Sequence, residues 1–206
     1  LHNGYGNAMD FEALQNQLKW IVKMANENDN IDFVCLGGDL TNGTVSTKQA
    51  HLDLLNELFT TLDACEKPVL VLNGNHDDNS YSTFNIDKVM TCTDWNDAVI
   101  NTIVNRDGIT VVQDTDMSNG PSKYYYYDIE GKKTRVICLD AANYPYEWDE
   151  ANGKWTLKVK NANASGVDKY YNSYNYWGYS ARQLQWLAEE ALTCEDGWDY
   201  IFRSDL

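Results

Sequence analysis

The sequence lacks any apolar run that could cross a bilayer, since its longest ones, such as Val69–Leu72, are only as long as a strand. Basic residues are also few: 16 Lys and Arg stand against 31 Asp and Glu, which gives a formal net charge of −15. Nucleic-acid backbones are bound mainly through clustered Lys and Arg, so this composition argues against a broad nucleic-acid-binding surface. A local cation site could still attract a phosphate ester.

Two further absences concern cysteine pairs and an initiating methionine. None of the five cysteines has a Cys-x-x-Cys spacing, and Cys35 and Cys138 lie inside apolar strand patterns. Because cysteine is often buried as a small apolar residue, we expect mostly buried free thiols. The sequence begins at Leu1, which fits both a removed signal peptide and a start inside the domain, so no cellular compartment is assigned.

Hydrophobic periodicity in the first half predicts two helices and two strands. Apolar residues at three- and four-residue steps indicate an amphipathic helix over residues 11–25, which Asp10 would cap, and another over about 47–65. Continuous apolar runs at 33–36 and 69–72 are typical of strands that are buried on both faces of a sheet. The order strand, helix, strand predicts a right-handed parallel βαβ unit.

The middle of the chain gives weaker signals followed by a clear hairpin. Residues 80–106 carry faint helical patterns, with Asp94 as a candidate cap, and we expect this part to be connective. Two apolar runs within 124–139 flank a turn that contains Gly131, which predicts an antiparallel hairpin.

The last third combines an aromatic-rich stretch with a helix and a strand. Residues 141–179 are dense in Tyr, Trp, Asn and Gly, and we interpret them as a long ordered insertion within a single domain that spans 1–206. Its aromatic side chains could line a substrate cleft, although packing of the insertion is the favoured interpretation. Ser180 and Gln183 form a capping-box pattern that predicts a helix, and residues 198–202 predict a final strand.

Polar residues that suit metal chemistry follow both strands of the βαβ unit. Asp39 follows two glycines after the first strand, and Asn-Gly-Asn-His-Asp at 73–77 follows the second. Parallel strands place their carboxyl ends at one sheet edge, so the two motifs should meet there. A carboxylate can bridge two cations, and an amide oxygen such as that of Asn75 can bind one without adding charge. The simpler alternative is that Asp39 and Asn75 are only turn residues.

Gly38-Asp39 followed by Gly-Asn-His-Asp at 74–77 resembles the second and third signature motifs of the calcineurin-like metallophosphoesterase superfamily, in order, strand context and separation. Residues 1–4 resemble the tail of that family's first motif, Asp-x-His, with its Asp falling just before Leu1. The resemblance implies an α/β fold in which central mixed β-sheets are flanked by helices in layers. It also implies a dinuclear centre of divalent or trivalent transition-metal ions, with manganese, iron or zinc as the candidates.

The resemblance also implies a role for each matching residue. The implied metal ligands are His2, Asp39 and Asn75, with Asp39 bridging the two ions; alternatively, His2 is only a terminal residue.

His76 would contact the phosphate and assist the leaving group, and Asp77 would support the turn after His76. Asn42 stands where some family members carry an acidic residue that polarises the catalytic histidine. Asn42 would therefore orient His76 without stabilising its charge.

The sequence departs from the family pattern near its end. No histidine follows His76, so the later Gly-His-x-His motif is missing, and Asp205 stands where the histidine of a final Ser-His pair is expected. Truncation, a replaced ligand and a false alignment are all compatible with Asp205, and we interpret the domain as incomplete at both ends. The remaining histidine, His51, is predicted to be a solvated helix residue without a role.

Two functions of different classes follow. The leading hypothesis is a hydrolase that cleaves phosphate mono- or diesters with a dinuclear metal centre. The alternative is a catalytically inactive domain of the same fold whose aromatic insertion binds a carbohydrate or protein partner, which the missing histidines motivate. The motifs do not distinguish nucleotide, lipid, sugar or protein substrates, and they indicate no oligomeric state.

Overall fold

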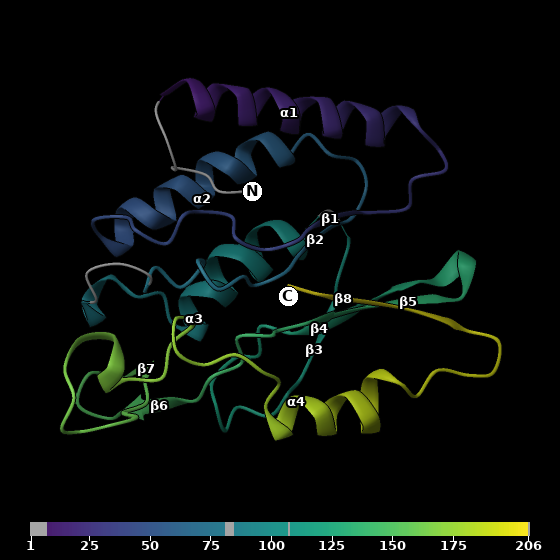
Figure 1. The fold of residues 1–206 in the computed structure, drawn as a ribbon. Helices are drawn as coiled ribbons and strands as arrows, with labels where there is room; N and C mark the ends of the chain where they lie inside the picture. Colours follow the sequence, from purple (N-terminus) through teal and green to yellow (C-terminus); the bar gives the residue numbers. More distant parts are fainter. Residues whose placement is uncertain (1–7, 81–84, 107, 206) are drawn as a thin grey trace.

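The computed structural model describes residues 8–80, 85–106 and 108–205. Helices alternate with short strands, and 3-10 or π-helical segments (η) join or extend several of them (Figure 1). None of the described helices combines the length and the apolarity that a membrane crossing needs. The elements in chain order are α1 (Ala8–Glu27), β1 (Val34–Leu36), α2 (Lys48–Leu62), β2 (Val69–Val71), η1 (Ile86–Lys88), α3 (Cys92–Trp95), η2 (Asn96–Val104), β3 (Val112–Gln113), β4 (Tyr125–Ile129), η3 (Glu130–Lys132), β5 (Thr134–Leu139), β6 (Tyr146–Asp149), β7 (Lys154–Leu157), η4 (Gly166–Lys169), α4 (Ala181–Trp186), η5 (Leu187–Ala191) and β8 (Asp199–Ser204).

These elements form stacked layers. In Figure 1, α1 and α2 lie on one side, β1 and β2 and the sheet of β3, β4, β5 and β8 lie in the middle, and α4 lies on the other side. The main core contains buried residues from α1, α2 and η2, from β1 and β2, and from β4 and β5. The hydroxyl group of Tyr125 joins the sheet of β4 to the β1–β2 sheet, because it donates to the carbonyl of Val71 at 2.9 Å and accepts from the amide of Val71 at 2.7 Å. The predicted layered α/β class is confirmed.

The predicted βαβ unit is present. Strands β1 and β2 pair in parallel, with Val34 opposite Val69 and Leu36 opposite Val71, and α2 connects them. Helix α2 begins after Thr47, whose hydroxyl accepts from the amide of Ala50 at 3.0 Å.

Helix α1 begins earlier than its apolar pattern predicted, and its predicted cap is wrong. Because the helix begins at Ala8, Asp10 lies inside its first turn and does not cap it.

His51 is buried, so the prediction of a solvated histidine is wrong. Its side chain is 0% exposed, and Nε2 lies 3.3 Å from the hydroxyl oxygen of Thr41. The helical face that carries His51 is covered by the loop after β1, which the pattern of α2 alone cannot reveal. Burial lowers the pKa of His51, because desolvation penalises the charged imidazole.

The segment of η1, α3 and η2 is part of the core, which corrects the prediction that residues 80–106 are connective. Val99, Ile100, Ile103 and Val104 are all fully buried against the main core. The cap of α3 is Thr91 rather than Asp94: the Thr91 hydroxyl accepts from the amide of Asp94, and the Asp94 carboxylate accepts from the amide of Thr91.

The second sheet has the strand order β3-β4-β5-β8. Strands β4 and β5 form the predicted antiparallel hairpin, and β8 is the predicted final strand, which pairs with β5 in parallel. The sheet is therefore mixed. In the hairpin turn the left-handed residue is Lys133, with φ of 48°, and not Gly131.

Both faces of β5 are buried, each in a different cluster. Val136 and Cys138 point to the main core, whereas Ile137 packs with Trp186 of α4. Ser180 caps α4 by accepting from the amide of Gln183 at 3.1 Å. The Gln183 side chain does not complete the predicted capping box, because it binds the backbone of residue 140 instead.

Residues 141–179 are ordered and contain the antiparallel pair β6 and β7. Tyr144 and Tyr146 are buried in a small cluster together with Val89, which anchors the segment to the rest of the chain. Trp148 and Trp177 remain 45% and 59% exposed. Packing therefore accounts for part of the aromatic content and leaves some side chains at the surface.

All five cysteines are free thiols, as predicted. Cys65, Cys92 and Cys138 are buried, and Cys35 and Cys194 are partly exposed. Burial raises the pKa of the Cys92 thiol to about 12, so this side chain behaves as an unreactive core residue.

We expect Ile103→Ala to lower the free energy of unfolding by about 2–5 kcal/mol, because it removes buried methyl groups of η2 and leaves a cavity in the main core. Asn101→Ala, on the exposed side of the same segment, is the matched control and should change stability by less than about 0.5 kcal/mol. Urea unfolding measures both. Equal small effects would show that η2 is peripheral.

We also expect His51 to make stability depend on pH. The native pKa is lowered, so the native imidazole stays neutral while the unfolded chain takes up a proton below about pH 6.5. The contribution of His51 is thus full above this pH and is lost as the pH falls below it. The loss of unfolding free energy on acidification through this range should be smaller in His51→Gln than in the wild type. An unchanged pH dependence in the variant would contradict the assignment.

Candidate metal centre

Polar residues that follow three different strands meet at one place. Asp39 follows β1, Asn75 follows β2 and Asp205 follows β8. Asn75 and Asp205 line the same small depression, together with Trp177. The carboxyl ends of the strands thus converge, at the kind of position where open α/β sheets bind their ligands.

Asp77 connects the loop after β1 to the loop after β2. Its Oδ1 accepts from the amide of Leu40 at 2.7 Å, and its Oδ2 accepts from the amide of Gly74 at 2.8 Å. Asp77 is fully buried, and desolvation raises the pKa of its carboxyl group to about 7. The geometry makes Asp77 a positioning residue, because its carboxylate faces backbone amides of the loops after β1 and β2.

The two loops approach so closely that glycine is required. A Cβ added at Gly74 would lie 2.2 Å from the backbone nitrogen of Asp39, and one at Gly38 would lie 2.8 Å from that of Gly74. Asp39 itself has a left-handed backbone with φ of 50°, a conformation that costs on the order of 1–3 kcal/mol for such a residue. The amide of His76 donates to Asp39 Oδ1 at 3.0 Å and helps to hold this conformation.

The carboxylates of Asp39 and Asp205 lie on the same side of Gly74. A Cβ at Gly74 would meet Asp39 Oδ1 at 2.5 Å and Asp205 Oδ2 at 2.7 Å. Burial, and then the nearby charge of Asp39, raise the pKa of Asp205. Two carboxylates held this close repel each other, and a bound cation would relieve the repulsion.

The donor set suits a hard metal ion. Two carboxylates and the amide of Asn75 offer oxygen ligands of the kind that divalent and trivalent ions prefer. Within residues 8–80, 85–106 and 108–205, no group of three or more His, Cys, Asp or Glu side chains could hold a metal ion. The set therefore fits a metal but needs further ligands, and the predicted ligand His2 lies outside the described residues.

His76 is held by the loop after β1. Its Nδ1 lies 2.7 Å from the carbonyl oxygen of Asn42, so Nδ1 carries a proton and donates it to this bond. The side chain of Asn42 is engaged elsewhere, since its Oδ1 accepts from the amide of Thr44 at 3.2 Å. The structure thus gives Asn42 a backbone contact with His76, which other residue types could also supply.

Comparison with known proteins decides the family. The sequence model of the calcineurin-like phosphoesterases matches residues 1–205. The chain belongs to the calcineurin-like phosphoesterase family. The family that the motifs at 38–39 and 74–77 resemble is thereby confirmed.

A solved structure agrees with this fold. A dimetal phosphatase from Danio rerio resembles this chain with a TM-score of 0.59 and 18% sequence identity. The match covers 95% of this chain and 61% of that chain, so our sequence corresponds to about three fifths of the zebrafish protein. At this identity the likeness concerns the fold. No curated protein matches the chain.

A buried network that the sequence patterns did not predict surrounds Asp140, which follows β5. The Asp140 carboxylate accepts from the side-chain amides of Asn73 at 2.9 Å and Asn143 at 3.2 Å, and it forms an ion pair with Lys123 at 3.3 Å. All four side chains are buried. The signal was present, because Asp140 follows an apolar strand just as Asp39 does.

Ser173, within residues 141–179, supports the loop of Asn75. The Ser173 hydroxyl donates to the carbonyl of Asn75 at 2.5 Å, and its amide donates to Asp78 at 3.0 Å. The indole of Trp177 donates to the Ser173 carbonyl at 2.5 Å. No sequence pattern could reveal these contacts, since Ser173 and Asn75 are 98 residues apart.

We expect Asp77→Ala to lower the free energy of unfolding by about 2–6 kcal/mol, because two buried amides lose their acceptor at about 1–3 kcal/mol each. Asp77→Asn retains one acceptor oxygen and should lose less. Glu57→Ala, at an exposed position of α2, is the control. If Asp77→Ala and Glu57→Ala unfold at the same urea concentration, the bridging role is wrong.

Proposed function

We propose that the chain provides the active centre of an enzyme that hydrolyses phosphate mono- or diesters with two transition-metal ions. The proposed ions are manganese, iron or zinc, and the proposed ligands are His2, Asp39, Asn75 and Asp205. The observation that best supports the proposal is the placement of His76, whose amide binds the Asp39 carboxylate while its ring is held by the loop after β1. Catalytic and metal-binding groups are thereby fixed to one another.

The metal ions, when bound, would activate a water molecule and neutralise charge on the phosphoryl oxygens. The protein holds their ligands in a rigid frame: Asp77 ties the two loops together, and Ser173 fixes the backbone of Asn75. A rigid frame matters because misplacement of reacting groups by even an ångström slows such reactions strongly.

His76 would contact the phosphate and protonate the departing oxygen. Because Nδ1 donates to the carbonyl of Asn42, Nε2 is the ring nitrogen that exchanges a proton with the substrate. Asn42 and Asp77 act through His76 and the loops, so they are positioning residues in this proposal. Metal content therefore tests the proposed ligands, and turnover at full metal content tests the role of His76.

The proposal predicts different defects for two substitutions. Asp39→Asn should reduce the metal content of the purified protein, because it removes a bridging carboxylate charge. His76→Ala should retain the metal but lower kcat by roughly 10²–10⁴-fold, the usual contribution of a general acid. Elemental analysis and hydrolysis of aryl phosphate monoesters and diesters, with manganese, iron or zinc supplied, measure both effects.

Asp53→Asn, at an exposed position of α2, serves as the control for the loss of one carboxylate charge and should leave metal content and turnover unchanged. Near-normal activity in both Asp39→Asn and His76→Ala would refute the residue assignments. A protein that binds no metal and hydrolyses neither type of ester would refute the enzyme itself.

A further inference from the structure

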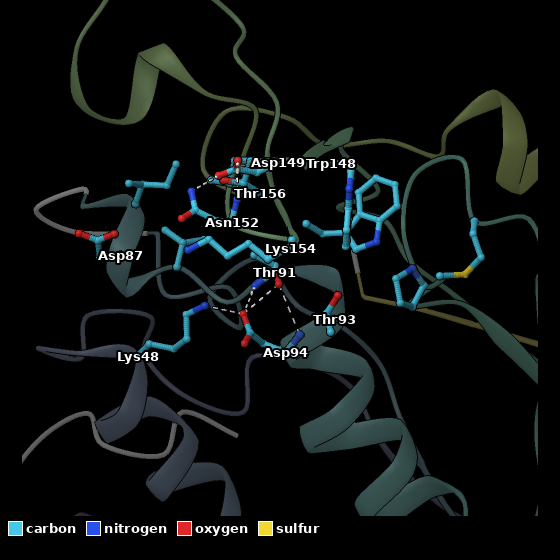
Figure 2. Close-up of a pocket in the computed structure, with 17 residues that line it drawn as sticks. Lys48, Asp87, Thr91, Thr93, Asp94, Trp148, Asp149, Asn152, Lys154 and Thr156 are labelled. Atoms are coloured by element: carbon cyan, nitrogen blue, oxygen red, sulfur yellow. Dashed lines mark hydrogen bonds and ion pairs between the residues drawn. The ribbon is translucent and has the colours of Figure 1, made fainter.

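A pocket of about 660 Å³ lies away from the candidate metal centre. Figure 2 shows it between the β6–β7 hairpin on one side and Lys48, η1 and the start of α3 on the other. None of the proposed metal ligands within the described residues lines it. Its volume falls within the range of about 300–1,000 Å³ that small-molecule sites occupy.

An aromatic wall closes one side of the pocket. Trp148 and Trp155 face each other across β6 and β7, with ring centroids 5.5 Å apart and an interplanar angle of 67°. Trp155 packs against the small cluster of the insertion, whereas Trp148 is 45% exposed. Paired cross-strand rings form a stiff platform, so a ligand that stacks on them orders little additional side-chain freedom.

The remaining lining is polar and can both donate and accept hydrogen bonds. Hydroxyl groups come from Thr93 and Thr156, an amide comes from Asn152, and an ammonium group comes from Lys154 (Figure 2). The Thr91 hydroxyl also faces the pocket, but it donates to Asp94 at 2.9 Å within the cap of α3. Side chains of this kind fix the orientation of a ligand that carries several hydroxyl groups.

The charges of the pocket argue against an anionic ligand. Asp94 forms an ion pair with Lys48 at 2.6 Å, and Asp149 accepts from the Asn152 side chain at 2.7 Å. With Asp87 and Lys154 included, the lining has three carboxylates and two ammonium groups. The chain as a whole carries −15. A phosphate or another polyanion would meet no excess of positive charge here.

We propose that this pocket binds a neutral oligosaccharide. A sugar ring has an apolar face of C–H groups and a rim of hydroxyl groups, and the pocket offers an indole wall at Trp148 beside hydroxyl, amide and charged side chains that can bind the rim. The ring stacks on Trp148, and its hydroxyl groups exchange hydrogen bonds with Thr93, Thr156 and Asn152. This site does not depend on the proposed hydrolysis.

The pocket is nevertheless fastened to the metal-centre loops. The side-chain amide of Asn79 donates to the carbonyl of Lys88 at 3.2 Å, and the amide of Met90 donates to the carbonyl of Asp78 at 2.9 Å. The pocket wall at 86–94 is therefore bonded to the turn that follows His76. A bound glycan would be held in a fixed position relative to the candidate centre.

Calorimetric titration with neutral oligosaccharides derived from starch, cellulose, xylan, mannan and chitin tests the proposal. We expect saturable binding of at least one, and an affinity that falls by roughly tenfold or more in Trp148→Ala, because buried aromatic anchors dominate binding energy. Trp20→Ala removes a 63% exposed indole from α1 and should leave the affinity unchanged. Asp39→Asn should also leave it unchanged, which separates this site from the proposed catalysis.

Thr93→Val is a second pocket variant, which is needed in case Trp148→Ala disrupts the β6–β7 hairpin. Thr93 lies on α3 and not on β6 or β7. It should weaken binding without changing the near-ultraviolet circular dichroism. The proposal is wrong if no oligosaccharide of the panel binds at millimolar concentration, or if both pocket variants bind as the wild type does. Tighter binding of an acidic glycan fragment than of any neutral one would also overturn it.

Discussion

The buried carboxylate of Asp77 is the constraint on which the candidate centre depends. Its two hydrogen bonds join the loop after β1 to the loop after β2, at a point where Gly38 and Gly74 let the backbones touch. Without this link, neither the left-handed backbone of Asp39 nor the contact between Asp39 and the amide of His76 would be held in place. A short sequence motif thus builds a rigid corner between two strands.

Residues from distant segments of the chain meet near these two loops. Strand β8 brings Asp205 beside Asp39, and the segment 141–179 brings Ser173 to the backbone of Asn75. Two neighbouring carboxylates are unfavourable by themselves and favour a cation between them. Membership of the calcineurin-like phosphoesterase family and this local electrostatic arrangement therefore lead to the same expectation of a metal centre.

The sequence predicted what depends on local pattern. The strands at 33–36 and 69–72, the hairpin of β4 and β5, and the motif at 73–77 are all encoded by neighbouring residues, and the structure has them where expected. His51 was misjudged because burial depends on which loop covers a helix face. The core role of η2 was missed for the same reason, and the Ser173 contact requires knowledge of a pairing across 98 residues.

The most direct test of the centre is a crystal structure of the protein soaked in manganese, with anomalous scattering used to locate the ions. The account predicts manganese bound to the carboxylates of Asp39 and Asp205 and to the amide oxygen of Asn75, next to the ring of His76. Manganese that contacts none of these side chains, or no manganese at this sheet edge, would contradict it.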